Sequence, residues 1–211
     1  PILELTLTSR DKGKNNFPMA GFPHHAAPSY ISKLIEAGHK VALCDQLEDP
    51  ALAKGIVKRD ITRIVTPGLV LEDETLTAGN NNYLMALWGC AEQIGLAALD
   101  LSTGDFVCTV THSHEQIFDE ILRLAPSELV LLDDEWHREH FSQWQKSHVG
   151  SLQCRIEWRA KAEKGIHRVQ ELGLLDSVLE TSTYLYAMKA SNLVLEYVLE
   201  NQNGLPGHLS S

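Results

Sequence analysis

The chain has little cysteine and no long apolar run. Its 211 residues include four cysteines, and no two of them form a Cys-x-x-Cys pair. Cys44, Cys90 and Cys108 lie in apolar runs, which is typical of buried free thiols in a reducing compartment. No apolar stretch approaches the roughly 18 residues of a membrane span, and no signal peptide is recognisable. We therefore expect a cytoplasmic protein that does not enter a membrane.

Signatures of nucleotide binding and covalent catalysis are also missing. The sequence contains neither Gly-x-Gly-x-x-Gly nor Gly-x-x-x-x-Gly-Lys-Ser/Thr, and it has no nucleophile motif of the Gly-x-Ser-x-Gly type. Its closely spaced histidines, such as His137 and His140, have no cysteine or third histidine close in sequence to complete a metal site. We interpret them as surface histidines, and we expect this chain to bind no cofactor and no metal.

Positive charge is scarce in most of the chain. The formal net charge is −10, which argues against nucleic-acid binding by the chain as a whole. Residues 1–70 nevertheless hold nine Lys/Arg against seven Asp/Glu, whereas residues 71–211 hold nine against twenty-one. The first segment therefore has a net charge of +2 and the second −12. Any contact with phosphate is expected in the first segment, and the acidic second segment is better suited to a protein partner.

The first part of the sequence predicts a small unit with strands on both sides of a helix. The alternation over Ile2–Thr8 is typical of a strand, and apolar residues after Ser29 recur at helical spacing up to Gly38. Two further strands are expected at Val41–Cys44 and Ile61–Val65. The acidic stretch 69–82 ends in Gly-Asn-Asn-Asn and is expected to be an unpacked linker, with a domain boundary near residue 76.

The second part predicts alternating strands and helices. Strands are expected at Tyr83–Trp88, Ile94–Asp100, Asp105–Val110, Glu128–Leu132 and Leu152–Trp158. Helices are expected after Ser113 and at 134–148, 160–172, 174–180 and 183–203. The order β-β-β-α-β-α-β-α is that of a ribonuclease H-like domain, in which two further strands extend an antiparallel meander. The predicted fold is α+β in the first unit and α/β in the second.

A basic loop comes directly after the first predicted strand. Arg10, Lys12 and Lys14 surround Gly13, and such a loop can follow a phosphate backbone because its cations neutralise charge and glycine permits close approach. A solvated hairpin tip has the same composition. The next residues, Pro18–Gly21, are small and apolar. Met19 is either an apolar wedge for a minor groove or a filler of the core.

A second basic cluster comprises Lys54, Lys58, Arg59 and Arg63. On a regular strand Arg59 and Arg63 share one face. They either meet phosphate or pair with the carboxylates nearby, and the sequence favours pairing.

Asp100 and Asp105 form the most enzyme-like pattern in the chain. A carboxylate at the end of a strand holds the paired metal ions of ribonuclease H-like nucleases, and such a site needs further carboxylates from later elements. The run Asp-Leu-Ser-Thr-Gly-Asp is also a good β-turn sequence. The turn is the favoured interpretation, and the metal-dependent nuclease stays an alternative, as does a module that only binds proteins.

Three blocks of sequence carry a family resemblance. They are Phe17-Pro-Met-Ala-Gly-Phe-Pro-His-His-Ala26, Val41-Ala-Leu-Cys-Asp-Gln-Leu-Glu-Asp-Pro50 and Lys54-Gly-Ile-Val-Lys-Arg-Asp-Ile-Thr-Arg-Ile-Val-Thr-Pro-Gly68. In order, spacing and content they resemble the MutS family of DNA mismatch-recognition proteins. The resemblance implies a partial mismatch-recognition domain over 1–76, a ribonuclease H-like connector domain without a nuclease site over 77–203, and the start of a link to a core domain over 204–211.

The resemblance also implies roles and partners. It places DNA contacts at Arg10, Lys12, Lys14, Pro18, Met19 and Gly21. The family's Phe-x-Glu reader is expected upstream of Pro1, and its ATPase half, which uses ATP and Mg²⁺, beyond Ser211. The whole protein is expected to bind mismatched double-stranded DNA as a homodimer and to recruit MutL. This piece is expected to be non-catalytic.

Overall fold

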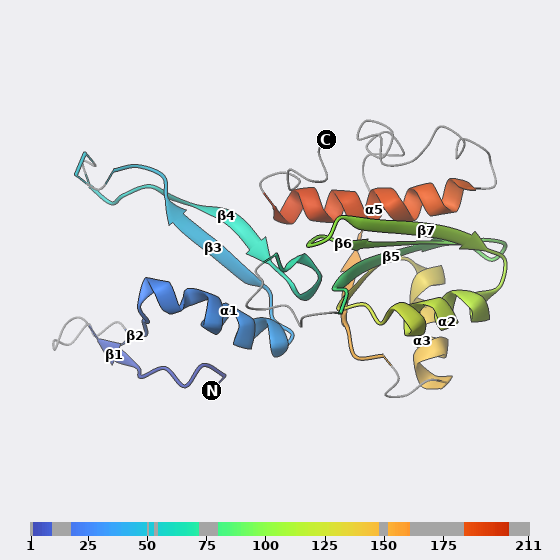
Figure 1. Cartoon of the computed structure of the whole chain (residues 1–211), viewed down its shortest axis with the longest axis horizontal. Helices are drawn as coiled ribbons and strands as arrows, with labels where there is room; N and C mark the ends of the chain where they lie inside the picture. Colours follow the sequence, from blue (N-terminus) through green and yellow to red (C-terminus); the bar gives the residue numbers. More distant parts are fainter. Residues whose placement is uncertain are drawn as a thin grey trace.

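The computed structural model describes residues 2–9, 18–49, 51–52, 55–71, 80–147, 152–160 and 184–202. A slender N-terminal unit, built on one helix and a long hairpin, extends away from a five-stranded sheet with helices on both faces (Figure 1). The sheet and its helices contain most of the buried core. No helix among the described residues is long and apolar enough to cross a bilayer.

The N-terminal helix starts earlier than its sequence predicts. A 3-10 turn, His24–Ala26, leads into α1, Ala27–Glu36, so Ser29 lies inside the helix and caps nothing with its side chain. Pro28 stands in the first turn, where its restricted φ favours the helical start. The predicted end is confirmed. Gly38 has a φ of 79°, its N–H bonds to the Ile35 carbonyl at 2.8 Å, and the next N–H bonds to Leu34 at 2.9 Å.

Two antiparallel strands, β3 (Val41–Gln46) and β4 (Arg59–Val65), form the long hairpin, and both predicted strands are confirmed with longer bounds. A small apolar cluster of Ile31 and Ile35 from α1 with Val41, Leu43, Val65 and Val70 holds the helix to one face of this hairpin.

The predicted strand Ile2–Thr8 is wrong for most of its length. Only β1 (Thr8–Ser9) is a strand, and it pairs with β2 (Pro18–Met19). Glu4 has a φ of 50°, in the left-handed region that interrupts an extended chain, and the Leu7 side chain is 71% exposed. Alternation alone does not make a strand when no neighbouring strand supplies hydrogen bonds and a core.

The second unit has the predicted sheet. Its strands are β5 (Tyr83–Gly89), β6 (Ile94–Asp100), β7 (Asp105–Thr111), β8 (Glu128–Leu132) and β9 (Arg155–Arg159). They lie in the order β7-β6-β5-β8-β9. β6 pairs antiparallel with both β5 and β7, whereas β8 is parallel to β5 and β9 is parallel to β8. This arrangement confirms the meander and the ribonuclease H-like order.

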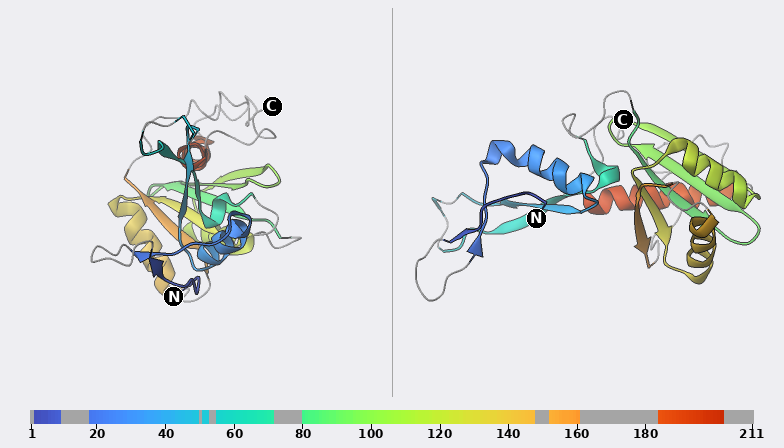
Figure 2. Two further views of the ribbon diagram at one scale, coloured as in Figure 1. Left: turned by 90° about the vertical axis from the view of Figure 1, so that its left-hand side faces the viewer. Right: turned by 90° about the horizontal axis from the view of Figure 1, so that it is seen from below.

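Helices cover both faces of this sheet (Figure 2). α5 (Leu185–Asn201) packs on one face, and α2 (His114–Leu124) and α3 (Glu135–Ser147) contribute to the core on the other. The predicted cap is confirmed, because the Ser113 hydroxyl accepts the Gln116 N–H at 3.3 Å. The helices predicted within 160–180 lie outside the described residues, apart from residue 160. Because both faces are covered, β6 and β8 are buried along their whole length.

The stretch predicted as an unpacked linker packs at both of its ends. Leu69 and Val70 are buried, and Asn82 joins three elements. Its backbone N–H donates to Asp100 at 3.0 Å, its amide donates to the Pro67 carbonyl at 2.9 Å, and its amide oxygen accepts from Ser127 at 2.5 Å. The prediction was wrong here because it treated asparagines as solvated, whereas one asparagine can satisfy several strand ends at once. Residues 72–79, where the boundary is predicted, lie outside the description.

The cysteines are free thiols, as predicted, but they are less buried than expected. Cys44 is exposed on β3, and Cys90, Cys108 and Cys154 are half-buried. Burial raises the pKa of the Cys154 thiol to about 12, with the nearby Glu128 carboxylate acting in the same direction.

Candidate functional site

The segment that the sequence links to DNA is held by two short strands. In the β1–β2 pair Thr8 lies opposite Met19 and Ser9 opposite Pro18. Arg10, Lys12 and Lys14 fall between these strands and lie outside the described residues. Since both ends of their loop are paired, the sequence places all three cations on the connection of one hairpin.

Met19 is a surface residue. Its side chain is 46% exposed, and it belongs to none of the hydrophobic clusters among the described residues. The interpretation of Met19 as core filler is therefore wrong. A Cβ atom added at Gly21 would meet nothing within 4 Å, so the surface beside Met19 is open. The segment Pro18–Gly21 thus presents small and apolar groups outward.

Phe22 is a surface aromatic that the sequence analysis did not single out. Its ring is 40% exposed and stacks on Tyr30 of α1, with ring centroids 4.4 Å apart. The Lys33 ammonium lies 5.6 Å from the centre of the Tyr30 ring. The stack ties the end of the Pro18–Gly21 segment to the helix. Its only sequence signal was an aromatic residue beside Gly21 and Pro23.

The second basic cluster is arranged differently from the prediction. The register places Arg63 opposite Leu43 and Arg59 opposite Gln46, with an irregularity at Thr62 between them. Since positions 43 and 46 of an alternating strand face opposite sides, Arg59 and Arg63 lie on opposite faces of the hairpin. An extra residue in one strand is invisible to a pattern of period two. Lys54 lies outside the described residues.

The carboxylates of this hairpin bind backbone and hydroxyl groups. Glu48 accepts the Lys58 backbone N–H at 2.6 Å, Asp49 accepts the Ala51 N–H at 2.9 Å, and Asp45 accepts the Thr62 hydroxyl at 2.6 Å. Within the described residues no ion pair joins Lys58 or Arg59 to a carboxylate. The predicted pairing is therefore wrong for these two cations, and both are exposed.

A buried carboxylate joins the two units. Glu128, at the start of β8, has no solvent exposure. One of its oxygens accepts from the Thr66 hydroxyl and from the Gly68 N–H, the latter at 3.1 Å. The other accepts the Tyr197 hydroxyl of α5 at 2.8 Å and lies 3.4 Å from Nε of Arg155. Glu128 thus bonds to the end of β4, to α5 and to β9 at one point.

A second, more exposed set of contacts lies at the end of α1. Lys40 Nζ lies 2.5 Å from Glu157 of β9, and Nη1 of Arg155 donates to the Gly38 carbonyl at 2.9 Å. Arg155 also pairs with Glu157 at 3.2 Å. The Arg155 guanidinium therefore contacts the last residues of α1 while its Nε lies next to Glu128. We call these contacts and those of Glu128 together the interdomain junction.

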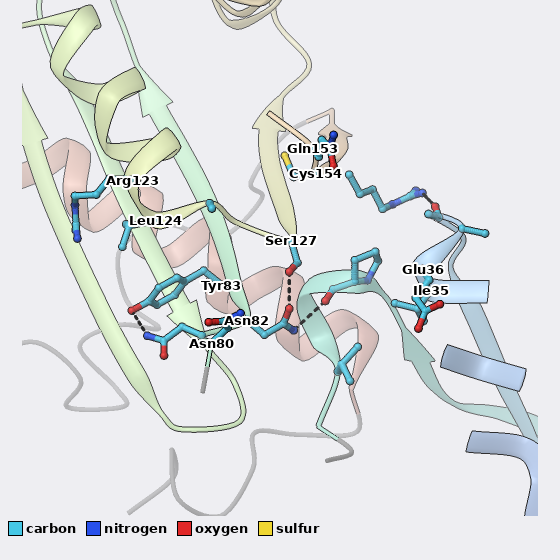
Figure 3. A pocket seen from close by; sticks show the side chains of 17 residues that line it. Ile35, Glu36, Asn80, Asn82, Tyr83, Arg123, Leu124, Ser127, Gln153 and Cys154 are labelled. Carbon is cyan, nitrogen blue, oxygen red and sulfur yellow. Dashed lines mark hydrogen bonds between the residues drawn. The ribbon is translucent and has the colours of Figure 1, made fainter. Parts of the chain in front are cut away.

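A polar cleft opens beside the junction (Figure 3). It has a volume of about 1080 Å³ and is lined by the end of α1, by 80–83 and by the starts of β8 and β9. Pro67, Asn82 and Ser127 all line the cleft, and the two hydrogen bonds of the Asn82 side chain connect the other two residues across it. The end of β4 is therefore fixed to the sheet from two sides, by Glu128 and by Asn82.

Burial sets the proton chemistry of the junction. It raises the pKa of the Tyr197 hydroxyl far above its usual range, and the charge and hydrogen bond of Glu128 act in the same direction. Tyr197 therefore remains a hydrogen-bond donor to Glu128 at any physiological pH. The arrangement therefore stabilises a fixed contact between α5 and the start of β8.

Asp100 is a turn residue. Its Oδ1 accepts from the Ser102 N–H at 2.9 Å and the Ser102 hydroxyl at 2.7 Å, and its Oδ2 accepts from Asn82. Burial alone would raise the pKa of Asp100, but these hydrogen bonds outweigh burial and lower it. Asp105 lies across the turn and accepts the Tyr83 hydroxyl at 2.6 Å. The turn interpretation is confirmed, and the described residues hold no group of three metal-binding side chains.

His137 is buried, so its interpretation as a surface histidine is wrong. Its side chain is 3% exposed, its Nε2 accepts the Gly89 N–H at 3.1 Å, and its Nδ1 lies 2.7 Å from Asp134. Because Nε2 accepts, the ring proton sits on Nδ1 and is donated to Asp134. Burial lowers the pKa of His137, although Asp134 opposes this. The neutral ring thus joins α3 to the end of β5.

These contacts predict a loss of stability in mild acid. The folded-state pKa of His137 lies below the ordinary value of 6.5. The contribution of the neutral ring to the free energy of unfolding is therefore fully present above pH 6.5, and it is lost as the pH falls through the folded-state pKa. Urea unfolding between about pH 7.5 and about pH 5 should show a fall in the free energy of unfolding that is smaller in His137→Gln. His25→Gln, at an exposed position, is the control and should keep the full dependence. Equal pH dependence in all three proteins would contradict this role.

Comparison with known proteins gives one consistent result. The family model described as MutS domain I matches residues 1–74, and that described as MutS domain II matches residues 82–210. A relative named DNA mismatch repair protein MutS, from Acetivibrio thermocellus, is 39% identical over 99% of this chain and 24% of its own length. The protein of that name from Clostridium novyi is 52% identical over 62% of this chain and 15% of its own length.

The chain spans about a quarter of the length of the relatives that it matches along its whole length. Among solved structures, the fowlpox virus resolvase in complex with Holliday junction DNA covers 56% of this chain and 97% of its own, with 10% identity and a TM-score of 0.41. That score is too low to support any statement about activity.

Proposed function

This chain belongs to the MutS family of DNA mismatch repair proteins, and on that premise we propose that its first unit contacts duplex DNA through the β1–β2 hairpin. The proposed contacts are Arg10, Lys12, Lys14, Pro18, Met19 and Gly21. The observation that carries the proposal is the exposure of Met19 beside open space at Gly21. An exposed apolar side chain next to a basic connection suits a minor groove, where an apolar group packs on base edges and cations meet phosphate.

The second unit is proposed to connect this DNA contact to the rest of the protein. The interdomain junction supports this role, because buried hydrogen bonds to Glu128 hold the end of β4 to the sheet, and Asn82 adds a part-buried hydrogen bond to Pro67 beside the junction. A displacement of the first unit by DNA would therefore be transmitted to β8 and α5. The acidic composition of residues 71–211 fits a protein-facing role for this unit.

Our proposals for the activities of the longer protein rest on its membership of the MutS family. We propose that the longer protein acts in the bacterial cytoplasm, dimerises, uses ATP with Mg²⁺ and recruits MutL, and that this piece is non-catalytic and holds no cofactor. The nuclease alternative is not favoured, because backbone and hydroxyl donors already occupy both oxygens of Asp100.

DNA binding by this chain tests the proposal. Fluorescence anisotropy with a G·T-mismatched duplex and its matched twin should show weak, salt-sensitive and equal binding, because residues 1–70 contain no Phe-x-Glu motif. Replacing Arg10, Lys12 and Lys14 together by alanine should reduce the slope of log K against log salt by about 3. Met19→Ala should weaken binding by up to about tenfold and leave that slope unchanged, since it removes an apolar contact.

A matched control is available in the second unit. Val107 is 39% exposed and apolar, close to the 46% of Met19, so Val107→Ala should leave DNA affinity unchanged. Equal DNA affinities for Met19→Ala and the parent chain would contradict the proposal that Met19 packs into the minor groove. A clear preference for the mismatch would show that discrimination lies within this chain rather than in a separate reader.

A further inference from the structure

The strand β7 lies at one end of the five-stranded sheet. It pairs with β6 along its whole length, from Asp105 opposite Asp100 to Thr111 opposite Ile94, and no described strand lies on its other side. Every second backbone N–H and C=O of an edge strand points away from the sheet. The outer side of β7 therefore offers the outward-pointing N–H and C=O groups of a seven-residue strand for pairing.

β7 lacks the features by which edge strands usually prevent such pairing. Its inner residues, Phe106–Val110, include no charge, no proline and no glycine, and its register with β6 is regular. Charge is confined to Asp105 at the first position. By contrast, β9 at the other end of the sheet carries Arg155, Glu157 and Arg159 and makes ion pairs with neighbouring elements. Among the described residues, β7 is therefore the less protected of the two edges.

A groove adjoins β7 on the α2 face. It has a volume of about 180 Å³, and its lining includes Val107 and Thr109 from β7, Leu96 from β6 and Leu124 from α2. Val107 is 39% exposed and Thr109 is exposed, whereas Cys108 on the other face is half-buried. A strand added beside β7 would place alternate side chains next to this groove.

The charges around the edge select the kind of strand. Asp105 of β7 and Glu115 and Asp119 of α2 are exposed, and the Glu120–Arg123 pair at the groove contributes no net charge. Residues 71–211 as a whole carry a net charge of −12. An incoming segment with Lys or Arg would be attracted, whereas a second copy of this chain, itself at −10, would be repelled.

From these observations we propose that β7 binds an extended, basic segment of a partner protein, which adds to the sheet as one further strand. Backbone hydrogen bonds to β7 provide affinity, and alternate apolar side chains enter the groove. The basic side chains alternate to the other face of the added strand, where the net negative charge of residues 71–211 attracts them. This surface is on the opposite end of the sheet from β9 and the interdomain junction. The proposal is independent of DNA binding by the first unit.

Three synthetic heptapeptides test this with the whole chain. Lys-Val-Lys-Val-Lys-Val-Lys has the length of β7 and should bind, with slower backbone hydrogen exchange within Phe106–Val110. The same peptide with proline for its central valine keeps the charge but cannot complete the ladder, and the peptide with glutamate for lysine reverses the charge. Both should bind at least about tenfold more weakly in fluorescence anisotropy.

Variants locate the site. Val107→Lys and Thr109→Lys place a cation at the edge from exposed positions and should each weaken binding by about tenfold. Ile56→Lys makes the same charge change at a residue that is 92% exposed in the first unit, and it should bind like the parent. No binding of the Lys-Val peptide at about 1 mM, or equal binding of the proline peptide, would overturn the proposal. A dimer in sedimentation that Val107→Lys dissociates would assign the edge to a second copy instead.

Discussion

Glu128→Ala is expected to lower the free energy of unfolding by about 3–5 kcal/mol, the usual cost of removing one partner from a buried charged network. The substitution leaves the Tyr197 hydroxyl and the Thr66 hydroxyl without their acceptor, and it leaves Arg155 with Glu157 as its remaining carboxylate partner. The Gly68 N–H also loses its bond. Urea unfolding measures the loss, and hydrogen exchange should show the largest local increase at Gly68.

Glu157→Ala provides the matched control. Glu157 is also a glutamate that pairs with Arg155 and bridges the two units through Lys40, but its side chain is 21% exposed and that of Lys40 is 28% exposed. Solvent screens this pair, so we expect a loss below about 1 kcal/mol. Glu128→Gln keeps one acceptor oxygen and should fall between the two. If Glu128→Ala cost no more than Glu157→Ala, the buried carboxylate would not be what holds the units together.

The second unit was predictable because its signals are local. Apolar runs of strand length, a serine cap before α2 and short polar turns each depend on a few neighbouring residues, and the sheet buries the apolar runs of β6 and β8 along their whole length. The strand predicted at Ile2–Thr8 was wrong because a strand depends on its partners. Its alternation was as regular as that of β7, but the structure describes no strand beside Ile2–Leu7.

The interdomain junction was not predictable from the sequence. It brings Gly38, Thr66, Glu128, Arg155 and Tyr197 together from five separated segments, and no pattern in the sequence links these five residues to one another. The sequence predicts Glu128 only as the first residue of a strand. The burial of His137 was not predictable for the same reason: its partner, the Gly89 N–H, lies 48 residues away in the sequence.

Faces of strands were predictable only where the register is regular. The prediction that Arg59 and Arg63 share a face failed at the irregularity near Thr62, which the sequence does not mark with glycine or proline. In β6 and β7 the register is regular, and the side chains alternate between the α5 face and the α2 face as the period requires.

Gly95→Ala is expected to destabilise the second unit by about 3 kcal/mol or more, because a Cβ at this position has no space. It would lie 2.1 Å from the carbonyl carbon and oxygen of Tyr186 and 2.4 Å from the nitrogen of Ala187, all backbone atoms of the first turn of α5. Backbone cannot move aside as a side chain can, so α5 would have to lift from β6. That displacement would open the core formed by Ala190, Leu193 and Val194.

Gly21→Ala is the control for this substitution, since the added Cβ meets nothing within 4 Å and Gly21 does not have a positive φ. Its free energy of unfolding should stay within about 0.5 kcal/mol of the parent. Urea unfolding followed by far-ultraviolet circular dichroism compares the two variants. A small loss in Gly95→Ala would mean that α5 lies farther from the sheet in solution. The Tyr197–Glu128 hydrogen bond, which depends on the same helix, would then be longer as well.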